Sequence, residues 1–271
     1  MPILHIVILA LVQGVTEFLP ISSSGHLVLV PWFAGWNDQG LILDVAVHVG
    51  TLGAVCAYLW RDIANMINGL WGVLKGKGVS SGARLAFYLV LGTLPIVAAG
   101  YAMNLYYPSG IRSIEVIGWT TLGFGVLLWV MDRFGVTLRR MEHLGLSDVV
   151  VIGVSQCLAL IPGTSRSGIT MTAGRLLGME RPDCARFSML LSIPAIVGAG
   201  TLKGLELYET GSATEISTAL TAAGFSFVSA LVAIALMMAW LKRASFTPFV
   251  IYRLALGGLL LALSYEWIVF S

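Results

Sequence analysis

Two polar stretches interrupt apolar sequence and decide the fold: Gln13-Gly-Val-Thr-Glu-Phe-Leu-Pro-Ile-Ser-Ser-Ser-Gly-His26 and Pro162-Gly-Thr-Ser-Arg-Ser-Gly-Ile-Thr170. Together they carry a carboxylate, an imidazole, a guanidinium and a cluster of hydroxyl groups. Burying such groups at membrane depth is costly unless they are paired, so intramembrane charges usually mark functional sites. Function is therefore expected where the two stretches meet.

The composition is typical of an integral membrane protein. Of the 271 residues, 57% are hydrophobic and 11% are charged, and the mean hydropathy is +0.88. Soluble domains carry about 25% charged residues. The three cysteines, Cys56, Cys157 and Cys184, lie in apolar stretches without CxxC spacing, which disfavours a disulfide framework or a zinc site. The N-terminus lacks a basic segment and a cleavage signal, so we expect it to belong to the mature structure.

Six apolar segments are long enough to cross a bilayer, which needs about 20 residues. They are 41–60, 85–104, 116–132, 185–203, 218–240 and 248–269. Residues 3–33 and 149–177 are also apolar, but a polar stretch breaks each into pieces of about 10–15 residues. Broken helices at membrane depth must line a cavity or pack inside protein. The sequence therefore predicts an all-α integral membrane protein with six transmembrane helices plus two re-entrant helical hairpins.

Basic residues predict the orientation. Twelve of the 16 Lys and Arg residues fall in loops on one side: Arg61, Lys75, Lys77, Arg84, Arg133, Arg139, Arg140, Arg175, Arg181, Arg186, Lys242 and Arg243. The other side has Arg112 and Lys203 beside an acidic segment with Glu206, Glu209 and Glu215. The positive-inside rule makes the first side cytoplasmic. Arg166 and Arg253 lie within apolar sequence, and Arg166 is a functional candidate. Arg253 could support the site from behind its ligands or snorkel to the interface, and we expect it to snorkel.

This orientation predicts an inverted-topology repeat. The first hairpin begins outside, the second begins inside, and three spans follow each, so residues 1–140 form one repeat and 141–271 the other within a single membrane domain. Residues 87–100 and 187–200 are identical at six of 14 positions. Inverted repeats place polar sites at their interface near the midplane, so the hairpin tips should face each other.

The second tip offers donors suited to phosphate. Backbone N–H groups before the helical stretch 169–177 would form an anion-binding nest. Arg166 adds a planar, bidentate donor. Hydroxyl groups come from both tips: Ser22, Ser23, Ser24, Ser165, Ser167 and Thr170.

Glu17 and His26 go beyond anion binding. A carboxylate beside phosphate repels it unless the carboxylate binds a cation, takes a proton or orients a base. With Ser23 and Arg166 nearby, these groups indicate phosphoryl-transfer chemistry. Each residue taken alone could instead be structural, with serines capping a helix and Arg166 pairing with Glu17 to hold the two halves together. His48, four residues after Asp44, lines the cavity or serves structure with even odds.

The two polar stretches resemble the two signatures of the bacterial undecaprenyl-diphosphatases of the bacitracin-resistance type. The similarity covers essentially the whole chain, including Ser-Phe-Thr-Pro-Phe-Val-Ile-Tyr-Arg at 245–253. Some members carry Glu at the position of Gln13. Because glutamine cannot act as a general base, we assign Gln13 a positioning role or a place in a metal shell.

The resemblance implies hydrolysis of undecaprenyl diphosphate to the monophosphate and inorganic phosphate, which recycles the lipid carrier for cell-wall synthesis and confers bacitracin resistance. It implies a multi-pass protein of the bacterial inner membrane whose site opens to the periplasmic face. It also implies stimulation by a divalent cation such as Mg²⁺ or Ca²⁺, with Glu17 and His26 handling protons or the cation and Glu17 as the candidate metal ligand. The site carried over by motif position comprises Glu17, Ser23, His26, Ser165, Arg166 and Thr170. Whether Ser23 or water is the nucleophile stays open at this point.

Other functions and partners remain to be weighed. An inverted repeat with a midplane anion site is also a common transporter plan, so a transporter or flippase of a lipid phosphate or another anion is the alternative. The type-2 phosphatidic-acid phosphatases share a Ser-Gly-His string, but their second motif requires His where this chain has Thr172. We expect a polyprenyl diphosphate and membrane lipids as partners and no nucleic acid, and the sequence is compatible with a homo-oligomer.

Overall fold

A computed structural model describes residues 2–36, 40–106, 113–210 and 213–267; the side chains of 24, 28, 31–33, 41–42, 199–210 and 213–214 fall outside that description. The described residues form helices and no strand. They are α1 (Ile3–Thr16), α2 (Ser23–Ala34), α3 (Leu41–Tyr58), α4 (Trp60–Leu74), α5 (Ser81–Tyr106), α6 (Ile114–Phe134), η1 (Met141–His143), α7 (Leu146–Gln156), η2 (Cys157–Leu160), α8 (Arg166–Leu176), α9 (Arg181–Thr210), α10 (Ala213–Leu241) and α11 (Thr247–Ser264).

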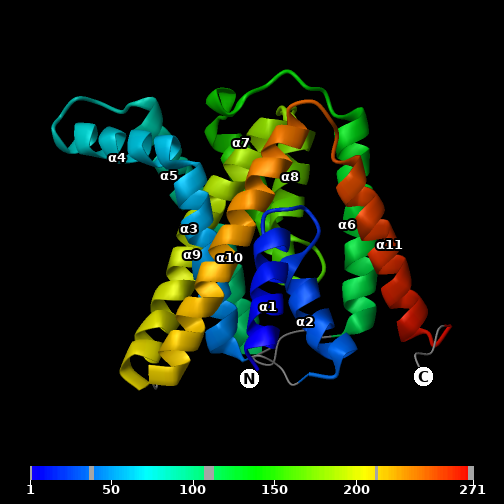
Figure 1. The fold of residues 1–271 in the computed structure, drawn as a ribbon. Coiled ribbons are helices and arrows are strands. Elements are labelled where there is room, and N and C mark those ends of the chain that lie inside the picture. The colour runs from blue at the N-terminus through cyan, green and yellow to red at the C-terminus, as the bar shows by residue number, and fades with distance from the viewer. Residues whose placement is uncertain (1, 37–39, 107–112, 211–212, 268–271) are drawn as a thin grey trace.

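The two polar stretches lie at breaks between short helices. The first occupies the turn between α1 and α2, and the second the turn between η2 and α8. In Figure 1, α1 begins at the end of the bundle that holds the N-terminus, and α2 returns toward that end. By contrast, α7 begins at the opposite end. The polar turns therefore meet in the interior of the bundle, where α8 packs on α6, α7 and α9.

The long helices make the chain a membrane protein. By length and composition, α5, α6, α11 and residues 215–241 of α10 could each cross a bilayer. The successive helices α3 and α4 count as a fifth candidate despite an 80° bend between them. Among the described residues α9 is not one of these candidates, so the count of six spans plus two re-entrant hairpins stays a prediction. The division into repeats at residue 140 also stays a prediction.

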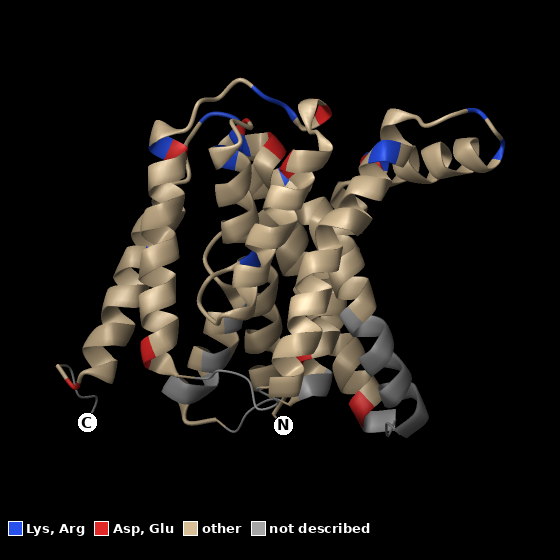
Figure 2. Ribbon diagram, turned by 180° about the vertical axis from the view of Figure 1, so that it is seen from behind, with Lys and Arg blue, Asp and Glu red and all other residues tan. Residues whose placement is uncertain are grey.

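Charged side chains gather at one end of the bundle, as the basic-loop pattern predicts (Figure 2). At this end Asp132, near the end of α6, is buried and joins three other segments. One carboxylate oxygen accepts from Arg175 Nε at 3.1 Å and from Arg181 Nε at 2.7 Å, and the other accepts from the Phe246 backbone N–H at 3.1 Å. Asp132 thereby fixes α6 against α8, α9 and the start of α11.

Replacement of Asp132 by Leu is expected to lower the thermal unfolding temperature in detergent. It would leave the fully buried Arg175 without its carboxylate, and breaking a buried pair costs about 3–5 kcal/mol. Glu180→Gln is the control, because it removes the exposed Arg140–Glu180 pair at the same end. Equal unfolding temperatures in the two variants would show that the buried network does not hold the helices.

Candidate active site

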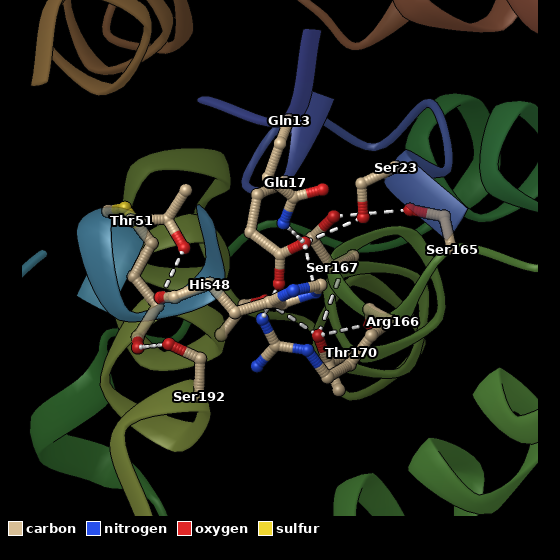
Figure 3. Close-up of polar contacts among 12 residues, drawn as sticks. Gln13, Glu17, Ser23, His48, Thr51, Ser165, Arg166, Ser167, Thr170 and Ser192 are labelled. Carbon is tan, nitrogen blue, oxygen red and sulfur yellow. Dashed lines mark hydrogen bonds and ion pairs between the residues drawn. The ribbon is translucent and has the colours of Figure 1, made fainter. Parts of the chain in front are cut away.

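Glu17 lies one residue beyond α1, and its buried carboxylate is the centre of the site (Figure 3). Oε1 accepts from Arg166 Nη2 at 2.7 Å. Oε2 accepts from Ser23 Oγ at 2.6 Å and from Gln13 Nε2 at 2.8 Å. The structure therefore brings four of the sequence-predicted residues into one cluster, with donors from α1, α2 and α8.

Each tip turns through a serine in the left-handed region. Ser22 has φ 76° and Ser165 has φ 70°. Such a backbone costs about 1–2 kcal/mol for an L-residue, and strain of this kind concentrates at functional sites. The Ser22 hydroxyl accepts from the Gly25 N–H at 3.4 Å, and the Ser165 hydroxyl accepts from the Gly168 N–H at 3.1 Å. Both serines therefore cap the helix that follows.

The other predicted phosphate ligands hold the tips in place. The Ser167 hydroxyl donates to the Leu19 carbonyl at 2.9 Å, which ties the second tip to the first. The Thr170 hydroxyl is buried, donates to the Arg166 carbonyl at 2.9 Å and lies 2.7 Å from Ser188 Oγ. The side chain of Ser24 lies outside the described residues. Phosphate binding by Ser22, Ser24, Ser165, Ser167 and Thr170 stays a prediction.

His26 is held away from the Glu17 cluster. Its Nδ1 lies 2.7 Å from the Ser22 carbonyl and its Nε2 lies 2.5 Å from Tyr252 Oη. A carbonyl oxygen only accepts, so Nδ1 carries the proton, and in the neutral ring Nε2 accepts from the Tyr252 hydroxyl. The Tyr252 ring also stacks on the imidazole, with centroids 5.6 Å apart. His26 forms no hydrogen bond or ion pair with Glu17 within the described part of the chain.

A different histidine stands beside Glu17. His48 on α3 places Nε2 at 3.6 Å from Glu17 Oε2, and its Nδ1 lies 2.6 Å from the Asp44 carbonyl. The sequence left His48 open between lining the cavity and serving structure; in this structure it lies at the cluster. The spacing of four residues between Asp44 and His48 predicted only that the two side chains share one face of a helix. It could not predict the contact with Glu17, because that contact depends on how α3 is rotated.

Arg253 on α11 corrects a prediction: the expectation that it snorkels is wrong. The side chain is 0% exposed. Nε donates to the Thr121 carbonyl at 3.0 Å, Nη1 to the Pro20 carbonyl at 3.3 Å, and Nη2 to the Gly163 carbonyl at 3.0 Å. Carbonyls at the two helix breaks, together with a carbonyl of α6, bond the guanidinium, so it does not need to reach water. Arg253 thus fastens both tips to α6.

Comparison with known proteins shows the family of this chain. The model of the family described as "Bacitracin resistance protein BacA" matches residues 6–259. The chain belongs to the BacA family. "Undecaprenyl-diphosphatase 1" of Rhodospirillum rubrum is 56% identical over 272 residues, covering 98% of this chain and 96% of the relative. "Undecaprenyl-diphosphatase" of Ruegeria pomeroyi is 51% identical, covering 98% and 100%, and that of Alteromonas mediterranea is 50% identical, covering 100% of each.

The oxygen ligands of this BacA-family site suit a metal ion that is also bound by the substrate better than a metal ion bound by protein side chains alone. No group of three or more His, Cys, Asp or Glu among the described residues could hold a metal. The buried Oε1 of Gln13 has no hydrogen-bond partner, and it belongs to the side chain that bonds Glu17. Mg²⁺ is usually held by one or two carboxylates together with substrate phosphates. Glu17 and Gln13 offer oxygen ligands of that kind.

Arg253→Gln is expected to reduce activity and stability together. Gln has fewer donors than the guanidinium, and each buried carbonyl left unpaired costs about 1–3 kcal/mol. Catalytic rate and unfolding temperature measured in detergent would test this, with the exposed Arg243→Gln as control. A variant with normal activity would show that the two tips do not depend on Arg253.

Tyr252→Phe removes only the hydroxyl that bonds His26. This variant is expected to lower the catalytic rate by about 3–10-fold, which corresponds to the loss of one hydrogen bond. The measurement is a double-mutant cycle with His26→Ala. Because Tyr252 acts through the imidazole, the double variant should be no slower than His26→Ala alone. Additive losses would contradict the coupling of the two side chains.

Proposed function

We propose that this chain hydrolyses undecaprenyl diphosphate to undecaprenyl phosphate and inorganic phosphate. The observation that carries the proposal is the convergence of Ser23 and Arg166, from separate tips, on the two oxygens of the buried Glu17 carboxylate. This arrangement supports Ser23 as a nucleophile, Glu17 as a base and the Arg166 guanidinium as a phosphate ligand. The curated names of the relatives, which match over nearly the full length, support the same activity and the same lipid substrate.

Ser23 is the nucleophile in this proposal. Its hydroxyl already donates to Glu17 Oε2, so the carboxylate is placed to take the proton as Ser23 Oγ attacks the terminal phosphorus. The new bond joins Oγ to phosphorus. The bond from phosphorus to the bridging oxygen breaks, and undecaprenyl phosphate leaves with the electron pair and takes the proton from Glu17, which restores the carboxylate. Water then attacks the phosphoserine with Glu17 as the base. The bond from phosphorus to Oγ breaks, inorganic phosphate leaves, and Glu17 returns the proton to Ser23 Oγ.

Arg166 offsets charge on the transferred phosphoryl group. Only Nη2 bonds Glu17, and Nε and Nη1 have no hydrogen-bond partner within the described part of the chain. Two guanidinium nitrogens therefore remain to donate to phosphate oxygens, and the planar guanidinium suits the geometry of a phosphate group. The first turn of α8 adds backbone N–H groups without intrahelical partners, which favour an anion at the same place.

The remaining assignments follow from this site. Glu17, with the free amide oxygen of Gln13, would hold a divalent cation together with the diphosphate. When bound, Mg²⁺ or Ca²⁺ would neutralise charge on the diphosphate oxygens. His26, fixed by Ser22 and Tyr252, would handle protons at the mouth of the site. The location is the bacterial inner membrane with the site open to the periplasmic face, supported by the basic residues at the opposite end.

Phosphate release from a C55 prenyl diphosphate by the purified protein in detergent tests the function. Wild type is expected to turn over, while Glu17→Gln, Ser23→Ala and Arg166→Lys each lose about 100-fold or more, because base, nucleophile and bidentate donor are removed in turn. EDTA followed by restored Mg²⁺ or Ca²⁺ would test the cation.

The exposed Ser147→Ala and Arg140→Lys serve as matched controls that keep wild-type rates. A folded wild type that releases no phosphate would overturn the hydrolase and favour carriage of a lipid phosphate. Retention of activity by Ser23→Ala alone would make water the nucleophile.

A further inference from the structure

The helix α4 does not follow the direction of the bundle. It begins at Trp60, directly after the 80° bend that ends α3. In Figure 1 it projects sideways from the end of the bundle opposite the N-terminus. The chain leaves it through a basic turn with Lys75 and Lys77 before α5 begins. A helix with this direction, at this end of a membrane protein, lies where lipid headgroups are expected.

Three faces divide the surface of α4. The face that packs on the protein carries Asp62, Met66 and Gly69, all buried. A second face is apolar and exposed, with Trp60 59%, Ile67 61%, Trp71 59% and Leu74 79% exposed. Their spacing of seven, four and three residues places them on one side of a helix of 3.6 residues per turn. The third face is polar, with Arg61, Asn68 and Lys75 at seven-residue spacings.

The cations on α4 and in the turn after it are not paired with carboxylates within the described ranges. Arg61 and Lys75 lie over the rings of Trp60 and Trp71, 5.4 Å and 5.0 Å from the centroids. Neither they nor Lys77 forms an ion pair in the described ranges. On the packed face, by contrast, Asp62 is already paired with Arg186. The free positive charge therefore lies next to the exposed tryptophans.

We propose that α4 docks on the leaflet at the basic end of the bundle and binds anionic phospholipid headgroups. Its apolar face enters the boundary between acyl chains and headgroups, where tryptophan is favoured. Arg61, Lys75 and Lys77 contact the lipid phosphates above that boundary. A second copy of the chain fits less well, because pairing along this helix would bring the same unpaired cations together.

This docking also concerns the site. α4 follows α3 after one residue, and α3 places His48 beside Glu17. A helix held at the headgroup level fixes the depth of α3 in the bilayer, and with it the position of His48.

Site-specific fluorescence in nanodiscs tests the docking. After Cys56, Cys157 and Cys184 are replaced by Ala, an environment-sensitive NBD probe is attached at Trp71→Cys on the apolar face or at Asn68→Cys on the polar face. Quenching by a phospholipid with a shallow doxyl group is expected to be at least about threefold stronger at position 71 than at 68. Quenching by iodide should show the reverse order.

Equal iodide quenching at both positions would overturn the proposal by placing α4 in water. A probe at position 71 that neither quencher reaches would overturn it in favour of a protein partner such as a second copy.

The headgroup preference is tested with doxyl lipids of two classes. Doxyl phosphatidylglycerol should quench the probe at position 71 more than doxyl phosphatidylcholine does. Lys75→Gln with Lys77→Gln should reduce that preference by at least about threefold, because each basic residue near the surface contributes to anion attraction. Lys242→Gln, exposed at the same end, should leave it unchanged. A preference that is absent in wild type, or unchanged in the double variant, would overturn the assignment to anionic headgroups.

Discussion

The structure depends on one buried carboxylate. Glu17 is about 5% exposed and cannot be left ionised in the interior without partners. Its partners come from the helix end that precedes it, from the start of α2 and from the start of α8. The two tips must therefore meet before the charge is stabilised, and the site and the fold are one arrangement. A polar cluster that joins distant segments in this way fixes a unique packing of otherwise apolar helices.

The two helix breaks share the same backbone conformation at the residue that caps the following helix. In each, a left-handed serine caps a helix and is followed at once by a residue that bonds Glu17: Ser23 after Ser22, and Arg166 after Ser165. The parallel is what a repeat would leave behind, although the chemistry of the following residue has diverged into a hydroxyl and a guanidinium. In the proposed reaction, these two equivalent positions would supply the nucleophile and the phosphate ligand.

The sequence was informative where local chemistry determines structure. Polar residues inside apolar segments were enough to predict both helix breaks and the meeting of Glu17, Ser23 and Arg166. The sequence could not predict contacts that depend on how a helix is rotated about its axis. His48 and Tyr252 sit on helices that are apolar on several sides, so no pattern indicated which face would meet the tips. Arg253 was misjudged because snorkelling assumes water as the only remedy for a buried cation, whereas broken helices supply carbonyls.

The two intramembrane arginines show how function can be distinguished from structure at one depth. All three nitrogens of the fully buried Arg253 donate to carbonyls, and four of its five N–H groups are bonded within the described residues. Arg166 donates from one nitrogen to Glu17, its other two nitrogens have no partner within the described residues, and 17% of its side chain is exposed. A buried guanidinium with most of its donors bonded to carbonyls holds segments together, whereas an accessible one with a single bond, at the N-terminus of a helix, still attracts an anion. The division of donors, more than the presence of charge, is the reason to propose phosphate binding at Arg166 and not at Arg253.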